Sequence, residues 1–258
     1  MKHLLPLSLL LSTALVAPAM AQDGSAPVRS APVAQPVIDT VRTPRDTPYP
    51  GTISLTVDAT DTTQRIWRVK EVIPVSSSGP LTLLYPEWLP GKHAPRGQIE
   101  KLAGLKITAN GQDIGWTRSP TDVYAFHVNV PEGAREIVAE FQFLNATAGN
   151  QGRVAVTDKM MNLQFETVSL YPAGYYVRQI PVQASVTYPQ GWTAYTALRG
   201  KMAGGTVSYD VTDYETLIDS PVFAGKYVKT ADLGSNVMLN MVAETPCELA
   251  ATPDQIGA

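Results

Sequence analysis

The sequence is poor in cysteine and balanced in charge. Cys247 is the only cysteine among 258 residues, which excludes an intrachain disulfide framework. Lysine and arginine number 20 against 23 aspartates and glutamates, so the formal net charge is −3. This balance excludes a strongly basic nucleic-acid-binding protein and an acidic disordered tail. The length suffices for one large domain or two small ones, each with a core of its own.

Apolar runs of transmembrane length are also absent. Residues 4–17 form an apolar stretch, but a membrane-spanning helix needs about 20 such residues. Lys2 precedes this stretch, and Ala19-Met20-Ala21 follows it with the small-x-small pattern of a signal-peptidase site. We therefore predict a signal peptide over residues 1–21 and an exported protein, periplasmic or secreted. A short membrane anchor is the alternative.

Residues 22–50 are rich in proline and alanine, with prolines at positions 27, 32, 36, 44, 48 and 50. Each proline fixes φ and removes a backbone donor, so neither a helix nor a central strand can run through this segment. We interpret it as a linker, either an extended tether or an arm that wraps the following domain, disordered to about Asp39.

From residue 51 onward the hydrophobic pattern has a period of two, typical of strands with one buried face. Residues 53–57, 124–130, 137–143 and 182–188 follow it; in the second, Phe126 should face the core, with Ala125 and His127 toward solvent. Asn110-Gly111 predicts a type I′ hairpin turn. The pattern indicates about a dozen short strands and, apart from a helical turn near residues 213–217, no helix. We expect an all-β antiparallel sandwich over residues 51–245.

Signatures of common catalytic sites are missing. After removal of residues 1–21 only two histidines remain, His93 and His127, and the zinc-peptidase string H-E-x-x-H does not occur. G-x-S-x-G, Walker and Rossmann motifs are absent too. His127 is interpreted as a solvent-facing or sheet-flanking residue, and Asn145-Ala146-Thr147 is a formal glycosylation sequon. We predict no catalytic, cofactor-binding or metal-binding residue in this chain.

Two segments are unusual. Pro86–Gly91 reads P-x-W-x-P-G, a rigid segment that leaves a strand, with a tryptophan that either plugs the sandwich or recognises a ligand. Tyr214–Val222 reads Y-x-x-L-I-D-S-P-V. In this order the two resemble the amino-terminal domain of the glycyl aminopeptidase family, zinc metallopeptidases of the thermolysin clan (peptidase family sixty-one). The resemblance covers roughly residues 51–242. It departs at Lys92-His93, where the family commonly has Ser-Tyr, so no role is assigned to these two residues.

The resemblance implies that a helical catalytic domain follows, carrying H-E-x-x-H and a further glutamate ligand. Zinc is then expected in that missing domain and not in this chain. The expected partners are this catalytic domain and a peptide substrate, with no nucleic acid and no membrane span. Six residues are candidate contacts of the domain interface or substrate cleft: Trp88, Pro90, Gly91, Tyr214, Asp219 and Ser220.

The end of the sequence resembles the beginning of a helix. Thr252-Pro253-Asp254-Gln255 combines an N-cap residue, a proline at the first helical position and acidic first-turn character. We interpret residues 246–258 as the truncated start of the following domain; a frayed tail is the alternative.

Together with this resemblance, the patterns predict a non-catalytic amino-terminal β domain of an exported glycyl-aminopeptidase-like enzyme. The resemblance implies that the parent enzyme cleaves amino-terminal glycine or alanine from peptides. The surface that normally docks its second domain should be left as an apolar patch on this chain. The alternative is a free-standing secreted sandwich that binds peptide or glycan on a stacking platform of aromatic residues, Tyr175, Tyr176, Trp192 and Tyr195. A chaperone-like sandwich has only the fold in its favour.

Overall fold

The structure is a computed structural model that describes residues 41–89 and 91–250. The expected signal peptide, linker residues 22–40, Pro90 and the expected helix start at Thr252 lie outside the described residues. No helix within them is long and apolar enough to cross a membrane.

The regular secondary structure of the described residues is mostly β-strand, as expected, with one short α-helix and several 3-10 turns. The strands are β1 (Ile53–Asp58), β2 (Ile66–Pro74), β3 (Gly79–Leu84), β4 (Leu102–Ala109), β5 (Gln112–Asp113), β6 (Thr117–Arg118), β7 (Ala125–Val130), β8 (Glu136–Leu144), β9 (Met160–Leu163), β10 (Tyr171–Pro172), β11 (Pro181–Thr187), β12 (Thr193–Tyr195), β13 (Gly200–Ala203), β14 (Thr206–Tyr209), β15 (Thr212–Asp213), β16 (Val222–Gly225), β17 (Tyr227–Asp232) and β18 (Met238–Ala243). The helical elements are η1 (Ile99–Lys101), η2 (Gly149–Gln151), η3 (Phe165–Thr167), η4 (Val177–Gln179), α1 (Tyr214–Ile218) and η5 (Pro246–Leu249).

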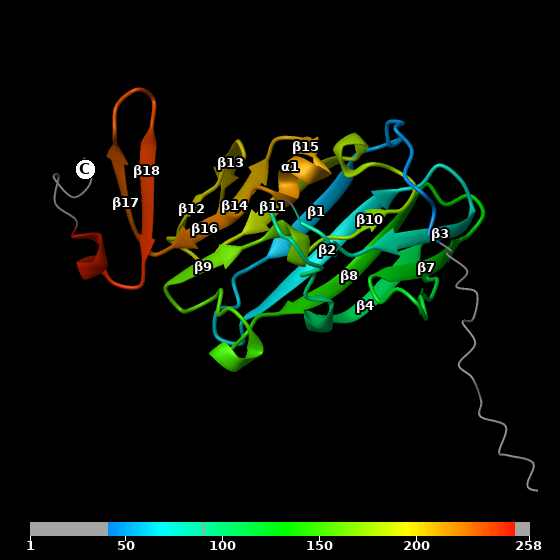
Figure 1. Ribbon diagram of the computed structural model, residues 1–258, viewed down its shortest axis with the longest axis horizontal. Coiled ribbons are helices and arrows are strands. Elements are labelled where there is room, and N and C mark those ends of the chain that lie inside the picture. Colours follow the sequence, from blue (N-terminus) through cyan, green and yellow to red (C-terminus); the bar gives the residue numbers. More distant parts are fainter. Residues whose placement is uncertain (1–40, 90, 251–258) are drawn as a thin grey trace, which may run out of the picture. The chain divides into compact units, whose positions relative to one another are not determined.

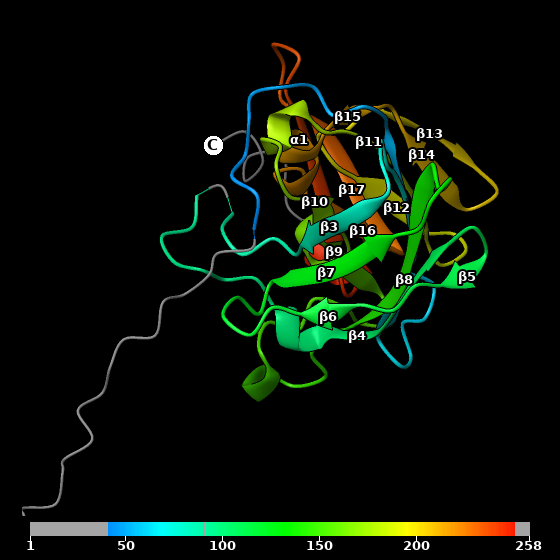
Figure 2. The same cartoon turned by 90° about the vertical axis from the view of Figure 1, so that its right-hand side faces the viewer.

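The strands form four sheets. The largest has nine strands in the order β13-β14-β11-β1-β2-β8-β4-β5, with β15 pairing beside β11 (Figure 1). A four-stranded sheet β10-β3-β7-β6, prominent in Figure 2, and a three-stranded sheet β12-β16-β9 complete the core. The pairing is antiparallel except between β1 and β11, which run parallel. The all-β sandwich prediction is confirmed, with this parallel pair as an addition.

The fourth sheet is the β17–β18 hairpin, drawn in orange and red in Figure 1. Among the described strands neither β17 nor β18 pairs with any other sheet. Its outer edges therefore carry backbone groups without a strand partner.

The core lies between the inner faces of the sheets, and the alternating segments supply it. The inward residues of β1 and β11, such as Leu55 and Val182, are fully buried, as expected. In β7, Phe126 is buried as expected and His127 is half-buried, its Nδ1 lying 3.0 Å from the Thr82 hydroxyl. The expectation for Ala125 is wrong, because the turn after β6 folds back over it: Ser119 donates its backbone N–H to the Ala125 carbonyl at 2.9 Å.

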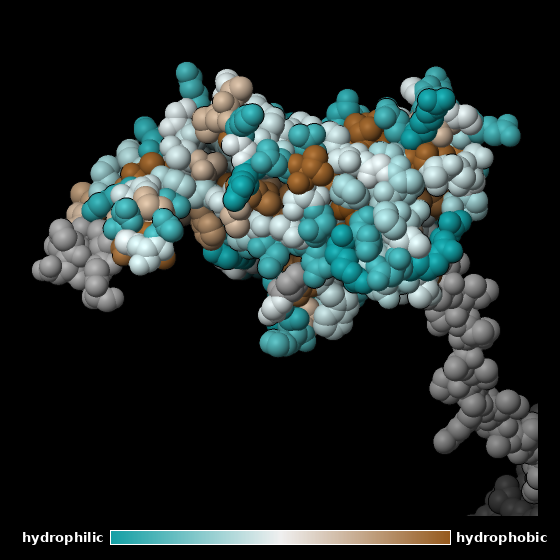
Figure 3. All heavy atoms as spheres, turned by 90° about the horizontal axis from the view of Figure 1, so that it is seen from above, coloured by the Kyte–Doolittle hydropathy of each residue, from teal (hydrophilic) through white to brown (hydrophobic). Residues whose placement is uncertain are grey.

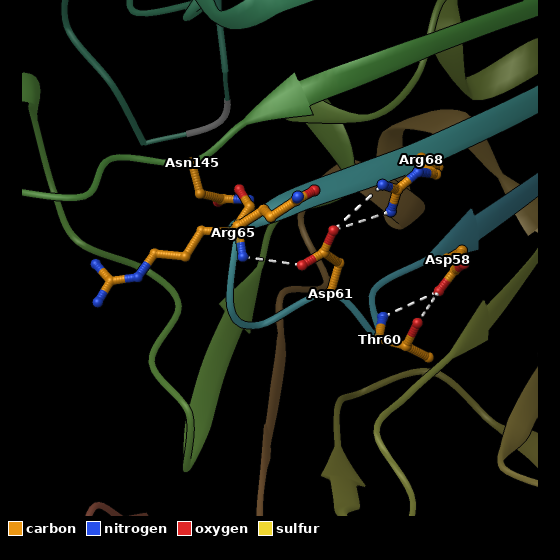
Figure 4. A network of polar contacts seen from close by, with 7 residues as sticks. Asp58, Thr60, Asp61, Arg65, Arg68 and Asn145 are labelled. Carbon is orange, nitrogen blue, oxygen red and sulfur yellow. Dashed lines mark hydrogen bonds and ion pairs between the residues drawn. The ribbon is translucent and has the colours of Figure 1, made fainter.

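Turn chemistry agrees with the sequence. Asn110 and Gly111 have φ values of 50° and 75°, the positive φ at both central positions that a type I′ turn requires. The β1–β2 connection is held by two aspartates (Figure 4). Asp58 accepts a hydrogen bond from the Thr60 N–H at 3.0 Å, and Asp61 accepts hydrogen bonds from both terminal nitrogens of Arg68 at 3.2 Å.

The same corner explains Asn145 of the formal sequon. Its Nδ2 donates to the Arg65 carbonyl at 3.2 Å, and the residue is buried (Figure 4). This amide nitrogen therefore has a structural hydrogen bond rather than an exposed surface position.

Residues 41–50 lie against the domain. The Arg45 N–H donates to the Gly174 carbonyl at 3.2 Å and the Tyr49 N–H to the Gln179 carbonyl at 2.9 Å. Tyr49 is buried, its ring edge-on to Tyr175 at 5.0 Å between centroids. This part of the proline-rich segment forms an arm along the surface, anchored by an aromatic residue.

Candidate functional site

The two unusual segments meet on one short turn, η3. From the segment that leads into Trp88, the Tyr85 hydroxyl donates to the Thr167 carbonyl at 3.3 Å. From α1, Tyr214 lies 2.7 Å from Ser169 Oγ, and Ser169 in turn donates to the Phe165 carbonyl at 2.7 Å. Because the single serine proton goes to Phe165, the Tyr214 hydroxyl is the donor to Ser169. Two buried tyrosines far apart in sequence thus fix the same turn.

The turn η3 presents a carboxyl group, that of Glu166. Its side chain is only 8% exposed, and its cationic partner is Lys92, whose Nζ lies 3.9 Å away on the Trp88 segment. Burial raises the pKa of Glu166 to about 7; Lys92 opposes this shift, and the negative charge of Asp219 adds to it. A carboxyl poised in this way can accept a hydrogen bond from an ammonium when ionised or donate one when protonated.

The Lys92 contact makes the titration of Glu166 testable. Carboxyl NMR should place its pKa near 7, and Lys92→Met should raise it further, because the nearby cation that favours the ionised form is removed. Lys201→Met, an exposed lysine on β13 at the end of the large sheet, is the control and should leave this pKa unchanged. A Glu166 pKa near 4.5 in the unchanged protein would contradict the assignment.

Residues 86–97, called here the Trp88 loop, are closed at their base by backbone contacts. The N–H groups of Arg96 and Gly97 both donate to the Glu87 carbonyl, at 2.9 and 3.2 Å. Position 97 requires glycine, because an added Cβ would lie 2.2 Å from the Pro86 carbonyl oxygen. The Tyr124 hydroxyl donates to the Gly97 carbonyl at 3.2 Å and pins the returning strand of the loop.

An aromatic cleft of about 380 Å³ lies between the Trp88 loop and α1. Trp88 is 60% exposed on its rim, so it does not plug the sandwich. Tyr214 contributes to the lining although almost all of its surface is buried. The remaining lining residues include Pro86, Leu89, Tyr171 and Tyr176. Of the six predicted contact residues, Trp88 and Tyr214 therefore lie together at this cleft.

The other predicted contacts differ in exposure. Gly91 is exposed with a φ of 73°, and Asp219 is exposed at the C-terminal end of α1. Ser220 is buried, and its hydroxyl donates to the Thr216 carbonyl at 2.7 Å. Ser220 therefore lies just after the helix and its C-cap residue Asp219, and its hydroxyl is engaged within the domain.

Sequence reasoning missed Glu166, although a signal was present. Glu166 is the only charged residue of the segment 160–170, which is otherwise apolar or neutral. A lone carboxylate in such a segment is either paired in the core or held at a site.

The described residues do not fit a zinc site. No three His, Cys, Asp or Glu side chains converge within residues 41–89 and 91–250. His93 lies on the exposed Trp88 loop, whereas His127 lies on β7 in contact with Thr82. A zinc site needs convergent ligands, and these two histidines do not supply them.

The aromatic residues of the alternative platform do not share a surface. Trp192 is buried, Tyr175 packs against Tyr49, and Tyr176 lies at the aromatic cleft, where the Arg178 guanidinium covers its ring at 4.3 Å. Tyr195 lines a different hollow, beside β18. Sequence proximity suggested a platform, but strand and turn geometry point the rings in different directions.

Comparison with known protein families shows to which family this chain belongs. Residues 54–226, more than half of the chain, match the family described as Peptidase M61 N-terminal domain. The chain belongs to this family. Trp88, Glu166 and Tyr214 all lie inside the matched residues of the M61 N-terminal domain, whereas β17 and β18 follow them.

Two solved structures are similar to this M61 N-terminal domain at low sequence identity, so the similarity concerns the fold alone. An aminopeptidase N family protein from Idiomarina loihiensis is 14% identical with a TM-score of 0.59, over 73% of this chain and 32% of that protein. An M1 zinc metallopeptidase from Deinococcus radiodurans is 12% identical with a TM-score of 0.38, over 80% of this chain and 50% of that protein. The chain thus spans half or less of either protein. Comparison with curated proteins finds no match.

Proposed function

We propose that this chain is the non-catalytic amino-terminal β domain of an exported zinc metallo-aminopeptidase. The observation that carries the proposal is the match of residues 54–226 to the M61 N-terminal domain. In the whole enzyme zinc belongs to the catalytic domain, where it polarises the scissile carbonyl and activates water. The signal-like residues 1–21 support export.

The surface that docks the catalytic domain is the region of the β17–β18 hairpin. A hollow of about 810 Å³ lies between this hairpin, η5 and the edge of the three-stranded sheet, and its lining is mainly apolar. Phe223, one of its lining residues, is 41% exposed. Apolar atoms are visible at the surface toward this end of the domain (Figure 3). Exposed apolar surface and unpaired strand edges are the features that a partner domain covers.

The Trp88 loop and η3 form the wall that faces the substrate. The aromatic cleft offers rings against which a peptide can pack, and Glu166 supplies a carboxyl that can bind an ammonium group. An amino-terminal residue carries such an ammonium group, so this wall suits the substrate class of an aminopeptidase. Glycine and alanine as preferred residues follow from the family resemblance.

Three measurements test this function. Purified chain alone should neither hydrolyse glycyl or alanyl anilides nor retain stoichiometric zinc, and it should bind a separately produced catalytic domain of an M61 peptidase. Phe223→Asp should weaken that binding at least about tenfold, because it places a charge in an apolar interface. Val211→Asp is the matched control: Val211 is 55% exposed in the segment before β15, outside the lining of the hollow. Hydrolysis by the chain alone that depends on His93 or His127 would overturn the proposal.

A further inference from the structure

A further hollow, here called the basic hollow, is lined in part by the Trp88 loop. It encloses about 650 Å³ and is lined by residues of three separate segments. The Trp88 loop supplies Lys92, His93 and Arg96, η1 supplies Lys101, and the segment after η2 supplies Gly152 and Arg153. Folding thus concentrates basic side chains on a protein whose formal net charge is −3.

Lys92 pairs with Glu166 at 3.9 Å, but in the described part of the chain the other lysine and the two arginines of the hollow are not neutralised by neighbours. Glu100 is the one acidic residue in the lining, and within the described residues no carboxylate forms an ion pair with Arg96, Lys101 or Arg153. Lys101 Nζ donates instead to the neutral Gln98 amide oxygen at 2.6 Å. Several like charges held together in a concave surface raise the local concentration of anions.

We propose that the basic hollow binds carboxylate groups of the peptide substrate, so that the enzyme favours peptides with acidic residues downstream of the cleaved end. This proposal rests on the proposed function, because it takes the ligand to be a peptide. Arginine is suited to it, since the guanidinium fork matches a carboxylate with two parallel hydrogen bonds.

The position of the hollow favours a peptide over a nucleic acid. One loop supplies both Trp88 of the aromatic cleft and Arg96 of the basic hollow, and Lys92 in the hollow also contacts Glu166. An extended chain that lies along this loop can therefore meet the Trp88 ring of the cleft and the cations of the hollow in turn. The balanced charge of the chain as a whole is unlike that of a nucleic-acid-binding surface.

The test is equilibrium binding of fluorescent peptides to the full chain, which needs no catalysis. The peptide Ala-Gly-Asp-Glu-Asp should bind at least about tenfold more tightly than Ala-Gly-Asn-Gln-Asn at low salt, and the difference should shrink as salt screens the charges. The double variant Arg96→Gln/Arg153→Gln should remove this preference. Lys201→Gln, an exposed lysine on β13, is the control and should retain it.

Every outcome of the binding experiment either supports or overturns the proposal. Equal binding of the two peptides, a preference that survives the double variant, or no binding of either peptide would overturn the proposal. Tighter binding of a single-stranded oligonucleotide than of the acidic peptide would overturn it in favour of a nucleic acid. Docking of the catalytic domain is a separate measurement, so failure of the proposed function is distinguished from failure of this inference.

Discussion

Replacing Phe165 by alanine is expected to lower the free energy of unfolding by about 3–5 kcal/mol. Phe165 is the first residue of η3 and is fully buried, with its ring edge-on to Tyr209 at 6.0 Å between centroids. Its removal leaves a cavity under the turn that both motif segments support. Denaturant unfolding followed by tryptophan fluorescence measures the loss.

The milder Phe165→Leu keeps most of the buried volume and should fold even where the alanine variant does not. Loosening of η3 should also expose the neighbouring Glu166 and bring its pKa down from about 7 toward 4.5. Phe223→Ala, at a side chain that is 41% exposed, is the matched control and should cost less than about 1 kcal/mol. A cost below about 1 kcal/mol for Phe165→Ala would contradict the assigned role.

The second large effect is expected at Glu71, where Glu71→Gln should stabilise the protein at neutral and alkaline pH by about 1–3 kcal/mol. Glu71 is fully buried on β2; its Oε2 accepts the Leu170 N–H at 2.9 Å, whereas its Oε1 has no hydrogen-bond partner among the described residues. Burial raises the pKa of Glu71 well above 4.5, although the Leu170 amide opposes this. The folded state therefore holds a proton that the unfolded state releases.

This proton difference sets the sign of the pH dependence. Below about pH 4.5 both states are protonated, and above it the unfolded state ionises first, so the stability of the unchanged protein falls as pH rises toward the folded pKa. The advantage of Glu71→Gln should accordingly be small at pH 4 and grow as the pH rises above it. Glu136→Gln, an exposed carboxylate on the neighbouring strand β8, should change stability by less than about 0.5 kcal/mol. A constant advantage at all pH values would show that Glu71 does not titrate as assigned.

Sequence patterning predicted the strands well because burial of one face imposes a period of two. The same pattern indicates that Glu71 faces the core, because it alternates in step with Val69 and Ile73 along β2. The pattern could not say that a carboxyl would be tolerated there, because that depends on the Leu170 amide, which lies 99 residues further along the chain.

The candidate site was predictable in part. The Trp88 and Tyr214 segments stood out by composition, and the structure joins them at one cleft. Their meeting point on η3 was not predictable, because the Tyr85 and Tyr214 hydrogen bonds to that turn are contacts across the core. The convergence of cations in the basic hollow likewise arises from three loops whose positions only the fold defines.

The parallel pair of β1 and β11 has a consequence for the order of assembly. Ile53 lies opposite Val182, so the central strand of the large sheet cannot acquire its second neighbour until most of the domain has been synthesised. Contacts between such distant parts of a chain form slowly, because a long loop must close first. The large sheet is therefore expected to close late, once the strands up to β11 are available to pair.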